Sequence, residues 1–195
     1  MSADVSTPLL PYRITICGLA ELPHHGDKGF SHVVSILDPA WPDPQDFAAY
    51  APHRRVVYRF DDVVEVGFGF TEPTRQDVEA ILQLGRELLA EHVTRLLVHC
   101  HAGVSRSTAT AVILMAQSNP GREQDVFAEL DRLRPRSWPN GLMIRIADES
   151  LRRDGALVAA LRAHQYRITR DDPEFAELLG RCGRAHEIAA LMEPR

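Results

Sequence analysis

The chain has 195 residues, of which 45% are hydrophobic, so it is long and apolar enough to form one domain with a sizeable core. Its formal net charge of −5 argues against a partner held by bulk electrostatic attraction, such as nucleic acid or an anionic membrane surface. No apolar run reaches the roughly 18 residues of a membrane-spanning helix, and residues 1–10 lack the basic and apolar regions of a secretion signal.

The cysteines, Cys17, Cys100 and Cys182, lie far apart and are odd in number. This pattern argues against a framework of disulfides and favours a reducing compartment. The sequence therefore predicts a cytoplasmic protein.

Short runs rich in β-branched and aromatic residues, bounded by Gly, Pro and Asp, predict strands at residues 13–17, 33–37, 55–60 and 96–99. Hydrophobic residues spaced three or four apart predict helices in the rest of the chain. The first predicted helices span Thr74 to about His92, residues 108–115, and residues 126–133, which end before Pro135. Further helices are predicted from Asn140 to just before Gly155, from Gly155 through Leu161, from Asp172 onward, and over 185–192.

Strands followed by helices predict an α/β fold, with a central sheet covered by helices on both faces. Residues 1–9 are expected to form a flexible N-terminus, and residues 10–165 the main domain. Residues 166–195 are expected to form a short helical extension at the C-terminus.

Residues 98–107, Val-His-Cys-His-Ala-Gly-Val-Ser-Arg-Ser, join a predicted buried strand to a predicted helix through a short loop. Such a loop turns backbone N–H groups toward one point, in front of the positive end of the helix dipole, and so binds phosphate. Gly103 can adopt the positive φ that the loop requires. The same dipoles would lower the pKa of a Cys100 thiol, and Arg106 offers a planar fork for two phosphate oxygens. The alternative for Cys100 is a buried cysteine of the core.

The order His99, Cys100, five residues, Arg106 and Ser107 resembles the phosphate-binding loop of the cysteine-dependent protein tyrosine phosphatases, in particular bacterial members of the dual-specificity branch. The resemblance covers roughly residues 10–165. It implies a mixed sheet of about five strands with the loop at its carboxyl edge. It also implies hydrolysis of phosphotyrosine proteins, with phosphoserine and phosphothreonine as further substrates, through a phosphocysteine and without a cofactor.

The family places a general acid, an aspartate, on a loop that follows a strand well before the cysteine. Here Asp61 and Asp62 follow the predicted strand at 55–60, and the resemblance aligns Asp62 with the acid. Asp61 stays open as the alternative, as does a simple turn. Glu65 and the Gly-Phe-Gly-Phe run at 67–70 suggest a mobile lid next to the acid.

The resemblance assigns phosphate binding to the loop residues His101, Ala102, Gly103, Val104 and Ser105, together with Arg106. The remaining predicted residues support this loop. Ser107 would donate a hydrogen bond to the departing sulfur or cap the helix, and His99 would tune the thiol.

Arg134-Pro135 and the Trp-Pro-Asn-Gly run at 138–141 resemble the segment that buttresses the phosphate loop in dual-specificity phosphatases. Asn140 is expected to hold the loop, to cap a helix, or to do both. His99, Cys100 and His101 cannot converge on one metal ion, because neighbouring side chains at a strand end point in opposite directions. No metal is therefore expected.

Two other functions stay open. Phosphatases of inositol lipids in the same superfamily tend to carry lysines in the loop, and residues 101–105 contain none, which disfavours a phosphoinositide relative to a phosphoprotein or another small phosphomonoester. The second alternative is a phosphate-binding module without catalysis. Hydrolysis of a generic aryl phosphate would separate the two classes.

Overall fold

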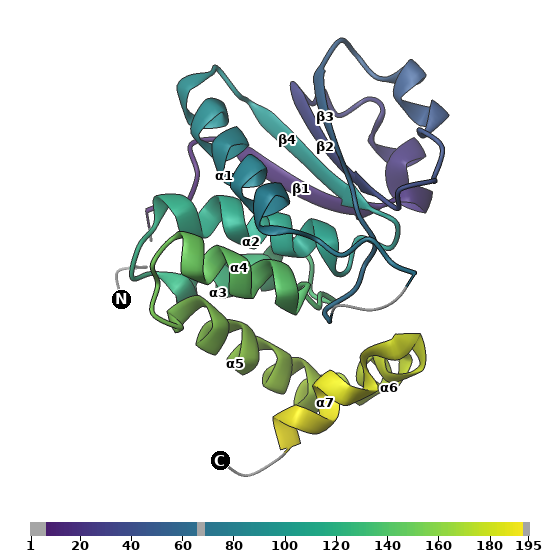
Figure 1. Ribbon diagram of the computed structural model, residues 1–195. Coiled ribbons are helices and arrows are strands. Elements are labelled where there is room, and N and C mark those ends of the chain that lie inside the picture. Colours follow the sequence, from purple (N-terminus) through teal and green to yellow (C-terminus); the bar gives the residue numbers. More distant parts are fainter. Residues whose placement is uncertain (1–6, 66–68, 193–195) are drawn as a thin grey trace, which may run out of the picture.

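The computed structural model describes residues 7–65 and 69–192, and its centre is a sheet of parallel strands (Figure 1). The strands are β1 (Arg13–Gly18), β2 (His32–Leu37), β3 (Arg54–Arg59) and β4 (Arg95–Cys100). Their order across the sheet is β1-β4-β2-β3. All of the strands predicted from the sequence are confirmed to within a residue or so.

The expectation of a mixed sheet with about five strands is wrong: within the described residues the sheet has four strands, and every pair is parallel. The physical reason is the length of the connections. Residues 19–31, 38–53 and 60–94 are long enough to carry the chain back across the sheet, so each strand starts from the same edge.

The predicted helices are also present. They are α1 (Arg75–Ala90), α2 (Arg106–Ser118), α3 (Glu123–Leu133), α4 (Gly141–Ser150), α5 (Ala156–Asp171), α6 (Pro173–Leu179) and α7 (Ala185–Met192). Three begin at the expected caps, because the side chains of Thr74, Asn140 and Asp172 each accept a hydrogen bond from the backbone N–H three residues later. No helix in the described part of the chain is long and apolar enough to cross a membrane.

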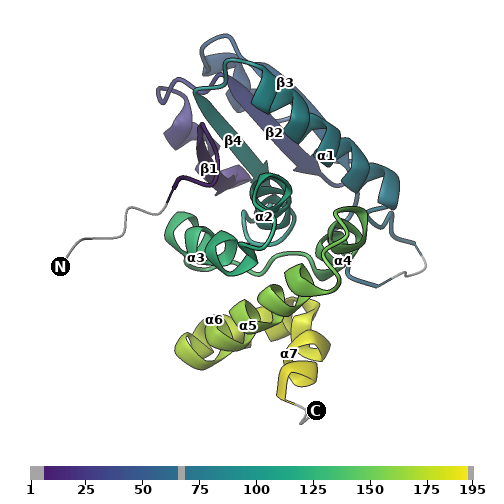
Figure 2. The ribbon, with the colours of Figure 1, turned by 90° about the vertical axis from the view of Figure 1, so that its left-hand side faces the viewer.

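Helices cover both faces of the sheet, but they are of different kinds. The α-helices lie on one face, and the short 3₁₀ helices η1 (Leu19–His25) and η2 (Gln45–Ala49) lie on the other (Figures 1 and 2). Alternate residues of β4 point to opposite faces of the sheet. Leu96 and Val98 pack in the main core under the α-helices, whereas Leu97 packs against η1 on the other face. Both connections contain prolines, with Pro23 inside η1 and Pro44 directly before η2.

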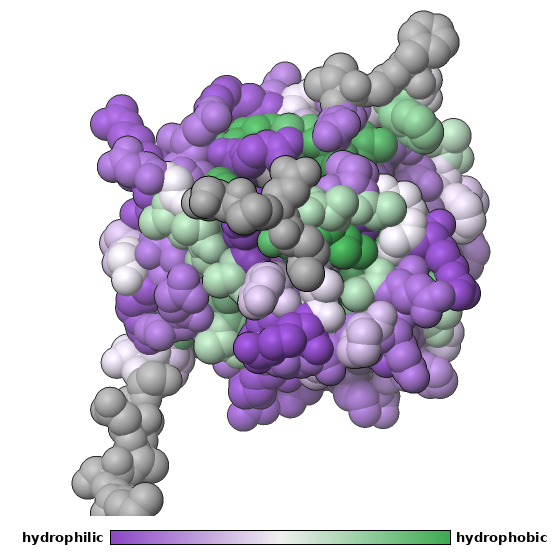
Figure 3. Space-filling model, turned by 90° about the horizontal axis from the view of Figure 1, so that it is seen from below, coloured by the Kyte–Doolittle hydropathy of each residue, from purple (hydrophilic) through white to green (hydrophobic). Residues whose placement is uncertain are grey.

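α2 runs through the middle of the helical layer, and its residues from Arg106 to Ala116 are buried. α5 lies outside it and continues past the expected domain boundary at residue 165 to Asp171. Beyond it, apolar side chains of the extension form a second core around Trp138; they are Ile168, Phe175, Leu179 and Leu191. The outer surface over these helices is mostly hydrophilic, with smaller hydrophobic areas between (Figure 3).

Candidate phosphate-binding site

The candidate site lies where the carboxyl ends of the parallel strands meet. The chain passes from β1 to β2 and β3 toward one edge of the sheet and then returns to place β4 between β1 and β2. The direction of the connections between strands therefore reverses at β4. Open α/β sheets bind ligands at such a point, outside the carboxyl ends of the strands. The loop of residues 101–105 leaves β4 here and leads directly into α2.

Two glycines allow the loop to lie against the end of β1. Gly103 has a φ of +70°, and a Cβ on it would stand 2.5 Å from the backbone carbonyl carbon of Cys17. A Cβ on Gly18 would stand 2.9 Å from the corresponding carbon of Ala102. Both contacts are too short for any side chain, so this loop conformation requires glycine at both positions.

The loop presents unused hydrogen-bond donors. None of the backbone N–H groups of residues 102–105 donates to an acceptor within residues 7–65 or 69–192. They stand at the N-terminus of α2, where the helix dipole is positive. Free N–H groups in a tight loop at a helix N-terminus form an anion site.

Arg106 is only 3% exposed, and one edge of its guanidinium is fixed by the neighbouring strand ends. Its Nη1 donates to Asp38 Oδ1 at 2.6 Å and to the carbonyl oxygen of Phe60 at 2.7 Å. Its buried Nε has no acceptor in the described part of the chain. A buried donor without an acceptor is costly, and a phosphate oxygen would satisfy it.

Asp38 was missed by the sequence analysis. The available signal was its place directly after the predicted strand at 33–37, which puts its side chain at the carboxyl edge of a parallel sheet. Its backbone N–H also donates to His101 Nε2 at 3.2 Å, so Asp38 contacts both Arg106 and the loop.

Cys100 is 2% exposed at the end of β4, and its Sγ lies 3.2 Å from Ser107 Oγ. His99 points to the other face, where its Nε2 lies 2.6 Å from Ser35 Oγ. Burial lowers the pKa of His99 to about 4, so this imidazole is neutral at pH 7. Within the described ranges, no three His, Cys, Asp or Glu residues are grouped so that they could hold a metal ion.

Asp62 lies at the rim of the loop of residues 101–105, the candidate phosphate loop. Its Oδ1 accepts hydrogen bonds from Ser105 Oγ at 2.7 Å, Asn140 Nδ2 at 2.9 Å and Arg184 Nη2 at 2.6 Å. Burial raises the pKa of Asp62, but Arg184, the Ser105 hydroxyl and Arg106 together hold it below its usual range.

The neighbouring Asp61 has a different role. Its Oδ2 accepts a hydrogen bond from the Thr71 backbone N–H at 2.8 Å, and its own N–H donates to the Thr71 carbonyl at 2.7 Å. Asp61 therefore closes the segment that follows β3, whereas Asp62 contacts the phosphate loop. Of the expected lid, residues 66–68 lie outside the described residues, and Phe70 is exposed.

The side chain that holds the phosphate loop is Arg134. It donates to the carbonyl oxygens of Gly103 at 3.1 Å and Ala102 at 3.2 Å, and both its Nη atoms bind Glu21 at 2.8 Å. Asn140, the residue expected to hold this loop, instead uses its side chain to cap α4 and to bind Asp62. Only its backbone N–H reaches the loop, at 3.3 Å from the Ser105 carbonyl oxygen.

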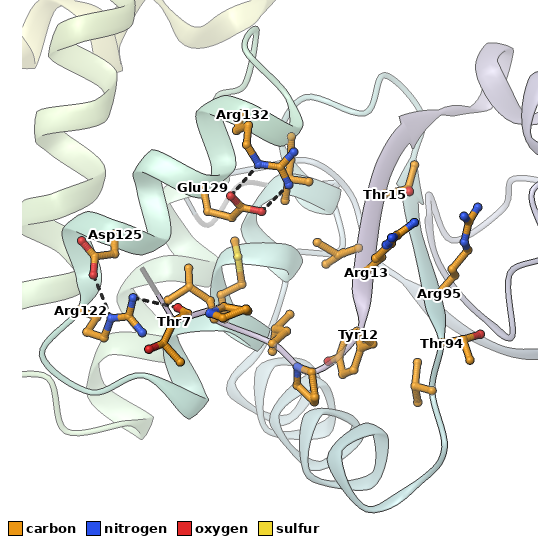
Figure 4. Close-up of a pocket in the computed structure, with 18 of the residues that line it drawn as sticks. Thr7, Tyr12, Arg13, Thr15, Thr94, Arg95, Arg122, Asp125, Glu129 and Arg132 are labelled. Atoms are coloured by element: carbon orange, nitrogen blue, oxygen red, sulfur yellow. Dashed lines mark hydrogen bonds and ion pairs between the residues drawn. The ribbon is translucent and has the colours of Figure 1, made fainter. Parts of the chain in front are cut away.

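A large hollow, of about 1260 Å³, lies at the opposite end of the sheet, between α3 and the starts of β1 and β4 (Figure 4). Two arginines at its rim, one just before α3 and one within it, are paired locally. Arg122 binds Asp125, and Arg132 binds Glu129. The hollow contains none of the residues of the phosphate loop.

The fold of the chain is similar to that of dual-specificity and tyrosine phosphatases, as three solved structures show. No family model matches the sequence, and no curated protein matches it. Three similar solved structures are human DUSP28, the PTP-2 phosphatase of Cydia pomonella, and the human tyrosine phosphatase-like serine/threonine/tyrosine-interacting protein.

The TM-scores are 0.56, 0.56 and 0.55, and the sequence identities are 15%, 21% and 20%. The alignments cover 76%, 73% and 73% of this chain, and 96%, 88% and 93% of the other chains, in the same order. At these identities the likeness establishes the fold of dual-specificity and tyrosine phosphatases. The relation to bacterial members stays a prediction.

Proposed function

We propose that this chain is a phosphomonoester hydrolase that acts on phosphotyrosine proteins through a phosphocysteine on Cys100. The observation that carries the proposal is the set of free donors in one loop: the N–H groups of 102–105 and the buried Nε of Arg106. They lie directly after the strand that carries Cys100, in the loop and at the first residue of α2. The same loop and fold support phosphoserine and phosphothreonine as further substrates.

In the first step, the Cys100 thiolate forms a bond to phosphorus and the bond to the leaving oxygen breaks, while protonated Asp62 gives that oxygen a proton. The loop N–H groups and Arg106 stabilise the charge on the other phosphate oxygens. In the second step, the Asp62 carboxylate takes a proton from water, and that water attacks phosphorus. The sulfur then leaves as a thiolate, which Ser107 stabilises from 3.2 Å.

The position of the Trp41 ring is an argument for an aromatic substrate. It is 45% exposed and lies edge-on against His101 of the loop, with 4.6 Å between the ring centroids. Arg59 fixes the segment by donating to the Trp41 carbonyl oxygen at 2.7 Å and binding Asp43 at 2.7 Å. A rigid exposed ring beside a phosphate site suits stacking against the ring of phosphotyrosine.

Trp41→Ala is expected to raise the KM for a phosphotyrosine peptide by about 3- to 10-fold, since an aromatic pair contributes that much affinity. The KM for the matching phosphoserine peptide should change little. Tyr166→Ala, which removes an exposed ring from α5, is the control and should change neither value. An equal rise for both peptides, or no rise, would refute the role given to Trp41.

Hydrolysis of an activated aryl phosphate in the presence of a chelator tests the proposed function. The wild-type protein should release phosphate, and Arg106→Lys should be slower by about 10²-fold or more, because a point charge does not replace the planar fork. The exposed Arg132→Lys should match the wild type. Activity that disappears in chelator and returns with a divalent metal would contradict the proposal.

The same assay separates the alternatives. A phosphate-binding module would bind inorganic phosphate without turnover; one of the similar structures is named an interacting protein that is phosphatase-like. A phosphoinositide or small-metabolite phosphatase would prefer those substrates in a panel that also contains phosphopeptides.

We also propose a reducing compartment, the cytoplasm. In the described residues Cys17, Cys100 and Cys182 are free thiols, and the proposed chemistry requires Cys100 to stay reduced.

A further inference from the structure

A buried arginine from the C-terminal extension reaches the candidate site. The side chain of Arg184 is 9% exposed, and its Nη2 lies 2.6 Å from Asp62 Oδ1, 3.2 Å from the Asp62 carbonyl oxygen and 3.3 Å from Ser105 Oγ. It therefore contacts both the loop of the candidate acid and the phosphate loop. No sequence pattern marks this residue among the other arginines of the chain.

The extension is built to deliver this side chain. α6 and α7 are joined by a kinked segment, η3 (Gly180–Arg184), in which Gly183 has a φ of +87°. Apolar residues of the extension pack around Trp138 and against Val104 of the phosphate loop, which fixes α6 and α7 there. On the far side of the guanidinium, Glu187 accepts from Arg184 Nη1 at 3.0 Å.

Arg184 lies between two carboxylates: its Nη1 binds Glu187 of the extension, and its Nη2 binds Asp62 at the candidate site. Asp62 Oδ1 also accepts from Ser105 and Asn140, and Arg106 and His101 are the other ionisable groups of the phosphate loop near it. Arg184 differs from Ser105 and Asn140 in that it carries a charge and forms a salt bridge with the Asp62 carboxylate. It both fixes where the carboxyl group stands and stabilises its ionised form.

We propose that Arg184 is the positioning residue of the general acid, so that the C-terminal extension completes the active site. The inference rests on the proposed function, in which Asp62 gives a proton in the first step and takes one in the second. Arg184 holds Asp62 at the rim of the loop for both steps.

The test compares Arg184→Met, which keeps an unbranched apolar stem but removes the guanidinium and its charge, with Arg184→Lys, which keeps a charge. Arg181→Met is the matched control, because Arg181 lies in the same segment but is exposed and paired with Glu177. For Arg184→Met, the plateau value of kcat/KM on an unactivated phenyl phosphate, at a pH where Asp62 is protonated in both proteins, should fall by about 10- to 100-fold. On an activated aryl phosphate, whose leaving group needs little help, the loss should stay below about 3-fold.

The pH profile adds a readout that a purely structural role would not move. Arg184 lowers the pKa of Asp62, so its removal raises that pKa and keeps the acid protonated to higher pH. The basic limb of kcat/KM should therefore move to higher pH in Arg184→Met and return toward the wild-type position in Arg184→Lys. Arg181→Met should keep the wild-type profile.

A double-mutant cycle shows whether Arg184 acts through Asp62. In an Asp62→Asn background, Arg184→Met should no longer change the ratio of rates on the two substrates. If wild type hydrolyses neither substrate, the proposed function fails and this inference fails with it. If wild type is active and Arg184→Met leaves both the ratio and the basic limb unchanged, the inference alone is wrong. Should Arg184→Met not fold, Arg184→Lys decides, since losing the multiple hydrogen bonds should still lower the rate on phenyl phosphate by about 3- to 10-fold.

Discussion

Cys100→Ser is expected to abolish turnover and to leave anion binding intact. A serine hydroxyl is not ionised near pH 7, so the phosphocysteine cannot form, and the rate should fall by at least about 10³-fold. The donors that bind phosphate are unaffected, because Arg134 holds the loop carbonyls and Asp38 holds Arg106. Phosphate release measures the first effect, and calorimetric titration with inorganic phosphate measures the second.

Cys182→Ser is the matched control, since Cys182 is exposed in the extension and should be exchangeable without loss. Turnover by Cys100→Ser above about a tenth of the wild-type rate would remove Cys100 as the nucleophile. Loss of phosphate binding together with turnover would mean that the substitution disturbs the loop.

Asp62→Asn should lower the rate on substrates with poor leaving groups by about 10²- to 10⁴-fold, because the leaving oxygen would depart without a proton. On activated aryl phosphates the loss should be much smaller. The amide oxygen can still accept from Ser105, Asn140 and Arg184, so the loop should keep its place. The basic limb of the pH profile should flatten, because that limb reports loss of the acid's proton.

Asp61→Asn is the control for this prediction. Asp61 bonds to Thr71 and makes no hydrogen bond to residues 101–105 in the described part of the chain, so its substitution should leave both the leaving-group dependence and the basic limb nearly unchanged. The reverse result, a large loss in Asp61→Asn and a small one in Asp62→Asn, would make Asp61 the acid. Two small losses would direct the search to Glu65.

Much of the fold was predictable because its signals are local. Helix caps such as Thr74 and Asn140 act on residues three positions away, and apolar periodicity identifies each strand and helix by itself. The number and direction of the strands were not predictable in this way. The resemblance suggested about five in a mixed sheet, whereas the described residues form four, and long connections let all of these run parallel.

By itself, the sequence determined the candidate loop, because Cys100, Gly103 and Arg106 lie in one continuous segment between a strand and a helix. Tertiary structure alone decided what surrounds it. Arg106 meets Asp38 across 68 positions of the chain, and Asp62 meets Arg184 across 122. No local pattern specifies such pairs, because each depends on the parallel strands ending at one edge and on the extension folding back over that edge.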